Sequence, residues 1–412
     1  MKRISFKQLC PRIGAVLLIS LTIAACHSGS DTPWETFVQP VEAYKPRANS
    51  GNAWDEYLLA ANLATHATEK YADRADLRQV EESDYLARIN DSLIRAIQAS
   101  SLPCHEEFTP HDPFLPRPEA VGFTAIGRGL GLRIKLAAKS NSAGNAATPI
   151  IAAHRMANQL SQGDAEDALL GYWIASNARI QAAGMIERID AGSLRTIGNS
   201  ILASLEDAPK ASQTIEHEYK NMLFGVQFVQ DTYRDKNYKL LHTAFYDQAN
   251  PAIEYLEGMR SSDRPKYFRN FAAEAKIYCN YATSVADQPV LERKKLDLEL
   301  SGERPWRRFS LHLFSPVISF IEARDRHITR SRLFALTCLA LAQGKSTGKA
   351  PSEFTGLPAN ATIDPYSGKP FPYLRAEREF KIYSVGEDGR DDGGETKGRG
   401  LAPDITIEPA EK

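Results

Sequence analysis

Several short strings in this chain have the residue types of a catalytic site, but their context does not fit the chemistry. Residues 344–348 read G-x-S-x-G, yet a helical pattern precedes them, whereas the nucleophile elbow of a hydrolase follows a strand. Glu216, His217 and Glu218 lack the second histidine of the H-E-x-x-H zinc signature, and consecutive residues of a helix do not face one ion. The sequence therefore assigns no catalytic residue.

Two histidines and one charged cluster remain as candidates for chemistry. His154 and His217 lie on or beside apolar helical stripes, so either they meet in one groove or each is a satisfied core residue, which their surroundings favour. Residues 324–330 contain three arginines, an aspartate and a histidine. A solvated helix face with i,i+4 ion pairs is the simpler interpretation of that cluster.

The three cysteines beyond the N-terminal segment form no obvious redox or metal motif. At most one disulfide can join Cys104, Cys279 and Cys338. Cys279 and Cys338 lie in apolar helical windows, so we expect them to be small buried hydrophobes. Cys104 lies in a proline-rich stretch beside His105 and Glu106. A metal site there would need ligands from elsewhere, and ordinary loop polarity is favoured.

The N-terminus has the pattern of an export signal. Four basic residues precede an apolar stretch, residues 13–23. Ala24, Ala25 and Cys26 follow this stretch. The stretch is shorter than a membrane span and suits a signal peptide. Small residues directly before a cysteine resemble the lipobox of bacterial lipoproteins. This resemblance implies cleavage after Ala25 and a diacylglycerol on Cys26; the alternative is a plain secretory signal that is cut at the same bond.

The lipoprotein resemblance implies a place for the protein in the cell. Acyl chains on Cys26 would hold the chain to a membrane, because each buried methylene contributes roughly 0.8 kcal/mol. His27 stands where an Asp resembles the inner-membrane retention signal of Gram-negative lipoproteins, which favours the outer membrane. The signal peptide would comprise residues 1–25. Residues 26–52, rich in Ser, Pro and Gly, read as a flexible tether.

The remainder of the chain reads as a helical body. The whole chain of 412 residues is 43% hydrophobic and 25% charged, as in a globular protein, and its 50 basic against 51 acidic residues give no basic field for nucleic acid. Ala-rich helical patterns joined by short polar turns recur over residues 53–345. They predict a mainly α fold, an irregular α-solenoid or helical-hairpin array similar to tetratricopeptide arrays, although no strict repeat is present. The clearest helical segments are 122–139, 148–160, 165–190, 212–233 and 316–343.

Local signals within the body predict how two of its helices begin and pack. Asp164 stands directly before a helical segment and can cap it. Residues 127–131 contain three glycines inside a helical stripe. They do not form a nucleotide-binding fingerprint, and we expect them to permit close helix packing.

A separate C-terminal element is predicted for residues 346–412. Residues 371–375 and 379–385 have the pattern of a β-hairpin closed by residues 376–378, and an acidic loop with Asp388 and four glycines follows. The sequence pattern of this element is that of strands and turns, whereas the pattern before it is mainly helical.

This element resembles the C-terminal segment of the major pseudopilin of type II secretion systems. The resemblance rests on Asp364-Pro365, Pro370 and Tyr373, on residues 383–389, and on Asp404-Ile405 at the end. It covers roughly 50 residues and says little about the helical body. The N-terminal processing motif and long apolar helix of a pseudopilin are not matched, so we do not expect a filament subunit.

The pseudopilin resemblance implies a structural calcium ion. By analogy Asp388 and Asp404 would supply side-chain oxygens and Val385 a backbone carbonyl to an ion that takes six to eight oxygens. The chain departs from the family pattern at Asp391 and Asp392, where the family has a glycine-rich stretch. A solvated acidic loop is therefore favoured over a bound ion.

Two classes of function are compatible with the sequence. The favoured hypothesis is a lipid-anchored envelope protein, not an enzyme, whose helical body binds or scaffolds another envelope protein. The alternative is an envelope hydrolase with a site assembled from residues distant in sequence. A pocket that brings a nucleophile, a base and an orienting acid within hydrogen-bond reach would favour the hydrolase.

Overall fold

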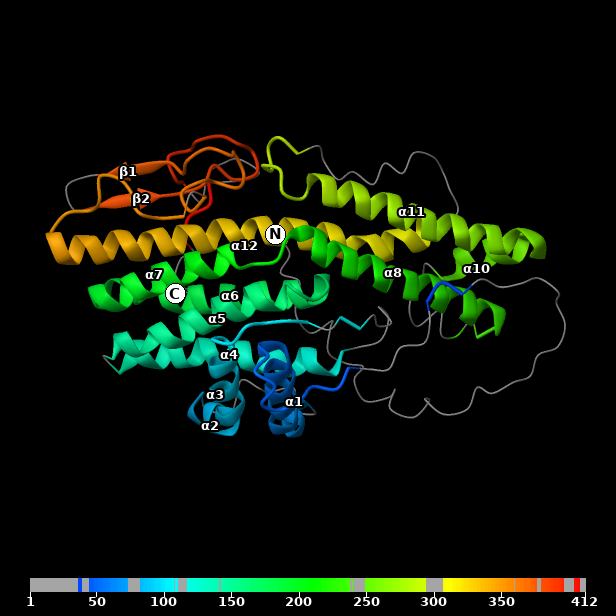
Figure 1. Cartoon of the computed structure of the whole chain (residues 1–412), viewed down its shortest axis with the longest axis horizontal. Helices are drawn as coiled ribbons and strands as arrows, with labels where there is room; N and C mark the ends of the chain where they lie inside the picture. The colour runs from blue at the N-terminus through cyan, green and yellow to red at the C-terminus, as the bar shows by residue number, and fades with distance from the viewer. Residues whose placement is uncertain are drawn as a thin grey trace.

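The computed structural model confirms a mainly α fold with a small C-terminal hairpin (Figure 1). The predicted signal peptide, Cys26 and part of the tether lie outside the residues that it describes. Those residues are 36–38, 44–72, 82–106, 108–109, 117–140, 142–237, 239, 249–293, 307–358, 360–375, 379–395 and 404–407.

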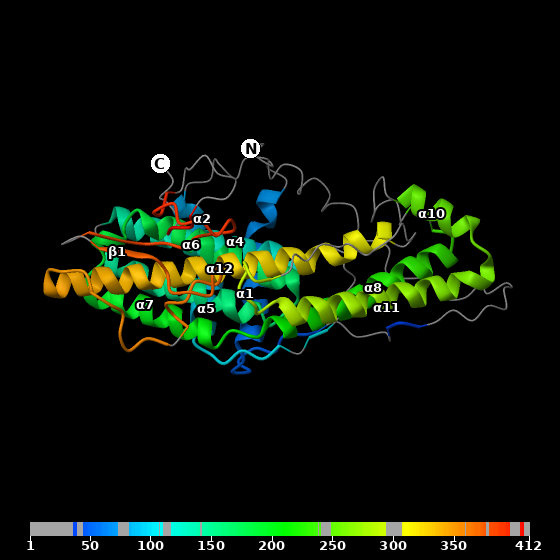
Figure 2. The same ribbon diagram turned by 90° about the horizontal axis from the view of Figure 1, so that it is seen from above.

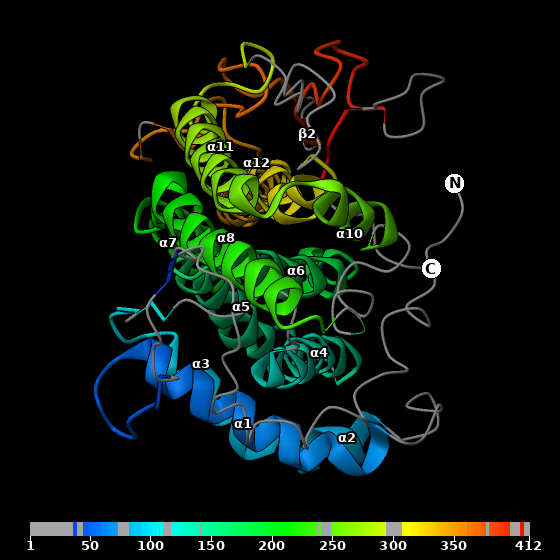
Figure 3. The same ribbon diagram turned by 90° about the vertical axis from the view of Figure 1, so that its right-hand side faces the viewer.

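The helices stack in successive layers from α1–α3 at one side to α11 and α12 at the other, with the strands outside α12 (Figure 3). Consecutive helices α5 and α6 pack together, as a helical-hairpin array predicts, and α4 lies against both α1 and α6. The α-helices are α1 (Ala53–Ala72), α2 (Glu82–Arg88), α3 (Asn90–Ala99), α4 (Pro118–Lys139), α5 (Ala147–Leu160), α6 (Ala165–Ala183), α7 (Ala191–Glu206), α8 (Ala211–Arg234), α10 (Ala249–Gly258), α11 (Arg264–Val285) and α12 (Arg307–Thr347). Short 3-10 turns are η2 (Ala143–Ala146), η3 (Ile186–Arg188) and η5 (Ser261–Asp263).

Helix boundaries follow capping chemistry. The Asp164 side chain accepts a hydrogen bond from the Asp167 amide and so caps α6, as the sequence predicts, and Asp190 caps α7 in the same way through Ser193. Pro118 occupies the first turn of α4, where its missing N–H costs nothing. The helical pattern expected over 165–190 is interrupted after Ala183, where α6 ends and η3 follows.

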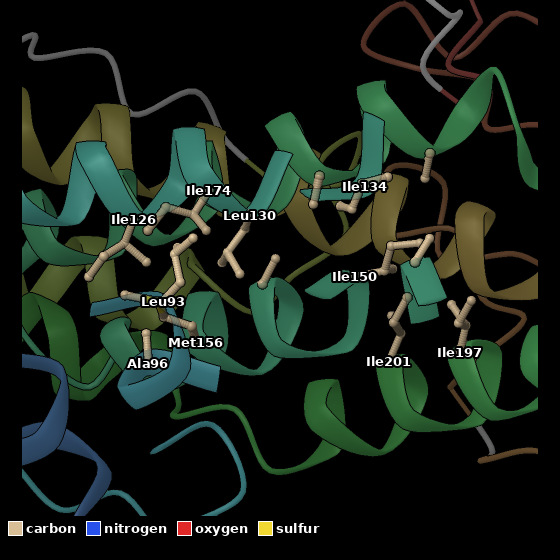
Figure 4. Packing of buried hydrophobic residues seen from close by; sticks show 14 of the residues in the cluster. Leu93, Ala96, Ile126, Leu130, Ile134, Ile150, Met156, Ile174, Ile197 and Ile201 are labelled. Carbon is tan, nitrogen blue, oxygen red and sulfur yellow. The ribbon is translucent and has the colours of Figure 1, made fainter. Parts of the chain in front are cut away.

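Glycines set how closely some of these helices cross. A Cβ added to Gly122 of α4 would lie 2.0 Å from the carbonyl oxygen of Ala61 in α1, so the two backbones are in direct contact. Gly127 leaves room for Trp173 of α6, which confirms the prediction that glycines 127–131 serve packing. The close approach brings the isoleucines and leucines of α3 to α7 into one apolar core (Figure 4).

The long helix α12 joins the parts of the molecule (Figure 2). Phe320 in its first half belongs to the core formed with α8 and α11, whereas Phe334 in its second half belongs to the core of α1 to α7. Leu333 and Leu336 on another face pack against Phe371 and Ile382 of the C-terminal element. One helix therefore contributes to each apolar cluster found among the described residues.

The C-terminal element is a short hairpin held by loops. β1 (Tyr373–Arg375) and β2 (Phe380–Ile382) are antiparallel, with Tyr373 opposite Ile382, so the strands are shorter than the sequence predicts. Buried Asp364 organises the loops: it accepts hydrogen bonds from the Ser384 hydroxyl at 2.8 Å and from the Tyr366 and Val385 amides. The predicted closing residues 376–378 lie outside the described residues.

The described parts of the predicted tether lie against the body. The Phe37 amide donates to Gln227 Oε1 of α8 at 2.8 Å, and the Arg47 amide donates to Asp55 Oδ1 of α1 at 3.1 Å. Among the residues described, no helix has both the length and the apolar composition of a membrane span.

Candidate functional site

A buried ionic cluster lies at the N-terminus of α6. Arg117, just before α4, places its guanidinium 3.2 Å from Asp164 Oδ2, 2.9 Å from Asp167 Oδ2 and 2.9 Å from Glu119 Oε1. Asn221 of α8 donates to Asp164 Oδ2 at 2.9 Å. The carboxylates raise the pKa of Arg117 well above its usual value despite its burial, so this side chain is always charged.

Two further carboxyl groups join the cluster without a cation of their own. Glu218 of α8 is buried and accepts from the Ala165 amide at 3.3 Å. The Glu106 side chain is only 5% exposed, and His217 Nδ1 is 3.6 Å from its Oε2, which has no hydrogen-bond partner among the described residues. The cluster thus holds more acidic groups than its single arginine can neutralise.

This excess of acidic groups is compensated by protons. Burial, followed by repulsion from Asp167 and Asp164, raises the pKa of Glu106 to about 9. Burial likewise raises the pKa of Asp167 and of Glu218 to about 8, and Asp164 adds to both shifts. Burial and repulsion among the acids thus favour the protonated form of these carboxyl groups, which hold their protons to higher pH than isolated carboxyl groups do.

His217 does not supply the missing charge. Burial lowers its pKa, its Nδ1 is 3.2 Å from the Gly163 carbonyl oxygen, and its ring stacks on Phe108 with the centroids 4.0 Å apart. The stacking fixes the loop that carries Glu106 against α8. At neutral pH the histidine is therefore a neutral neighbour of Glu106.

A pocket of about 570 Å³ adjoins this cluster and shares Glu106 with it. It lies between the loop before α4, the end of α5 and the connection from α7 to α8. Carboxyl groups of Glu106 and Asp207 line it, and none of the described lining residues is a lysine or an arginine. The other lining residues are Leu102, Pro103, Cys104, His105, Gln159, Gln162, Pro209 and Gln213.

The cysteine of this pocket is not an activated nucleophile. Burial, with the nearby Glu106, raises the pKa of Cys104 to about 12, so its sulfur remains a thiol at neutral pH. Its Sγ is 3.9 Å from the Gln159 carbonyl oxygen. Cys104, Cys279 and Cys338 are all buried free thiols.

The two histidines that the sequence singles out lie in different environments. His154 is 1% exposed in α5, with Nδ1 2.9 Å from the Ile150 carbonyl oxygen, and burial lowers its pKa to about 3. His327 of α12 shares this buried region, with Nε2 3.1 Å from Asn158 Oδ1. The structure thus places His154 in the core, as favoured, whereas His217 lies beside the acidic cluster.

The charged cluster of α12 is only partly a solvated face. Asp325 and His327 are buried, and Arg293 makes two hydrogen bonds to Asp325, at 2.7 and 3.2 Å. Arg293 belongs to the connector after α11, which lies against α12. The sequence pattern did not indicate that this arginine contacts Asp325. Arg326, by contrast, pairs with Glu387 at the surface.

The three predicted calcium ligands take part in different hydrogen bonds. Asp404 is buried and its Oδ2 accepts from the Gly394 and Asp392 amides, at 2.7 and 3.0 Å, whereas its Oδ1 has no hydrogen-bond partner among the described residues. Exposed Asp388 accepts from the Arg390 amide, and the Val385 amide donates to Asp364. Within the described residues, no three Asp, Glu, His or Cys side chains converge as a metal site. The residues as they lie do not form a complete calcium site, and calcium stays a prediction.

Sequence reasoning did not find the acidic cluster. It identified Asp164 only as a helix cap and Glu106 only as a polar loop residue. The cluster joins a loop, α4, α6 and α8, with Arg117 47 positions from Asp164 and Glu106 112 positions from Glu218. The one local signal was the density of acids around residues 164–167, directly after a glycine-containing turn.

Comparison with known proteins adds no family. No protein-family model, no curated protein and no solved structure matches this chain.

Proposed function

We propose that the chain is a lipid-anchored cell-envelope protein whose helical body binds another envelope protein without catalysing a reaction. The anchor would be an acyl-modified Cys26, for which the Ala24-Ala25-Cys26 motif is the support. His27 favours attachment to the outer membrane if the host is Gram-negative.

The polar groups that line the pocket beside Glu106 are the observation that favours a binding function over a catalytic one. The thiol of this pocket is held protonated, and the pocket's other polar side chains are those of His105, two carboxyl groups and three glutamine amides. A nucleophile needs a base within hydrogen-bond reach, and the described lining residues do not bring such a pair together. An open polar pocket of this kind suits recognition.

Site-specific crosslinking in the native envelope tests this proposal. A photoreactive residue in place of exposed Gln213, at the pocket rim, should yield a discrete adduct with one envelope protein. The same residue in place of exposed Glu257, in α10, is the control. Capture of the same proteins at both positions, or of none at Gln213, would contradict a partner at this pocket.

An envelope hydrolase is the second candidate, and Glu106 is the observation that favours it. A carboxyl group that keeps its proton near neutral pH is suited to general-acid catalysis. Hydrolysis of chromogenic ester or glycoside substrates by the purified chain, lost in Glu106→Gln, would establish this function in place of binding.

A further inference from the structure

The pocket beside Glu106 has a charge pattern that specifies its ligand. Carboxyl groups of Glu106 and Asp207 line it without a lysine or arginine among the described lining residues. Gln162 and Gln213 add side-chain oxygens that can accept hydrogen bonds. The oxygens of these carboxyl and amide groups can accept hydrogen bonds from a cation that donates them.

The Glu106 side chain lines this pocket, and its Oε2 is buried from solvent. Its side chain is 5% exposed, and Oε2 has no hydrogen-bond partner among the described residues. A buried polar atom without a partner is unfavourable, so a donor that reached it would be stabilising. His217 Nδ1, at 3.6 Å, is beyond hydrogen-bond distance.

The acidic groups behind Glu106 strengthen this preference. Asp164 and Asp167, before and in the first turn of α6, repel the charged form of Glu106, and the guanidinium of Arg117 that offsets this repulsion already contacts both aspartates. A second cation would offset the remaining repulsion.

We propose that this pocket binds an alkylammonium group, with the cationic head against Glu106 and Asp207. This inference rests on the proposed binding function and names the chemistry of its ligand. The group can belong to a free diamine or to a lysine side chain of a partner protein. Binding is coupled to one proton: the Glu106 carboxylic acid releases its proton as the ammonium takes its place.

Titration calorimetry of the full-length chain, purified in nonionic detergent, tests the inference. The probes are 1,4-diaminobutane and N-acetyl-lysine methylamide, and 1,4-butanediol is the neutral analogue. We expect saturable binding of an amine with a dissociation constant below about 10 mM, no binding of the diol, and proton release seen as a buffer-dependent heat. Tighter binding of the diamine would indicate a free amine as the ligand, and tighter binding of the lysine derivative a protein side chain.

Matched variants locate the site. Glu106→Gln should weaken amine binding about tenfold or more and abolish proton release, because it removes the charge-assisted hydrogen bond. Asp207→Asn, at an exposed position with little bearing on folding, should weaken it about threefold. Glu257→Gln and Asp263→Asn, exposed charges in α10 and η5, should change it less than about twofold.

Two results would overturn the inference. One is the lack of saturable binding of either amine; the other is equal affinity in wild type and in both pocket variants. Neither depends on the crosslinking at Gln213: a captured partner without amine binding would refute only the ligand chemistry. Amine binding without a captured protein would refute only the protein partner.

Discussion

At the scale of single residues, the main feature is a set of carboxyl groups that folding places around one arginine. Glu106, Asp167 and Glu218 have raised pKa values because they are buried among other acids. Such groups bind protons more tightly in the folded chain than in the unfolded one. Folding therefore becomes less favourable as the pH rises through the range in which only the folded chain keeps these protons.

Glu106→Gln should reveal this linkage. The unfolded Glu106 loses its proton near its ordinary pKa of 4.5, and the folded one only near 9, so its contribution to stability is lost between these values. Glutamine has no proton to lose. We expect the variant to match wild type at pH 5 and to exceed it by about 1–3 kcal/mol in unfolding free energy at pH 9. Denaturant unfolding at both pH values measures the difference, and parallel pH profiles would contradict the assigned environment.

At the scale of elements, the helices were more predictable than the site between them. The helical pattern of residues 212–233 and the cap at Asp164 correspond closely to α8 and to the start of α6. Both depend on neighbours in the chain. The partner of Asp325 and the surroundings of Glu106 depend on segments brought together by folding, so no local pattern could indicate them.

Gly122→Ala tests the closest helix crossing. The added Cβ would lie 2.0 Å from the Ala61 carbonyl oxygen, which is backbone and cannot turn away. Separating α1 from α4 should lower the unfolding free energy by about 2–4 kcal/mol. Gly344→Ala in α12, whose nearest contact would be 4.0 Å away, is the matched control and should be neutral or stabilising by up to about 1 kcal/mol. Equal melting temperatures of the two variants would show that the crossing is not tight.

The acidic loop offers a second test at this scale. If it binds calcium, as the pseudopilin resemblance implies, calcium added after chelation should raise the melting temperature, because a ligand that binds only the folded chain stabilises it. Asp404→Asn should abolish that rise, since the buried Asp404 Oδ1 is the carboxylate oxygen without a partner in the described loop. If calcium did not change the melting temperature of the wild type, the prediction that the loop binds calcium would be wrong.

At the scale of the whole molecule, the sequence was sufficient for the mainly α fold and the C-terminal hairpin, because helical periodicity and turn residues recur over long stretches. The sequence did not show that α12 contacts several separate parts of the molecule. Its faces pack against α1–α7, α8 with α11, and the C-terminal element. The contacts of α12 with α6 and α7 join segments that lie far apart in the chain, and periodicity does not show such contacts.

The proposed anchor determines where this molecule acts, and intact mass spectrometry of the mature protein from its native membrane tests it most directly. We expect a chain that begins at Cys26 and carries the mass of a diacylglyceryl group, with Cys26→Ser lacking that mass and leaving the membrane fraction. A mature chain with an unmodified Cys26, or one that retains residues 1–25, would contradict the central claim.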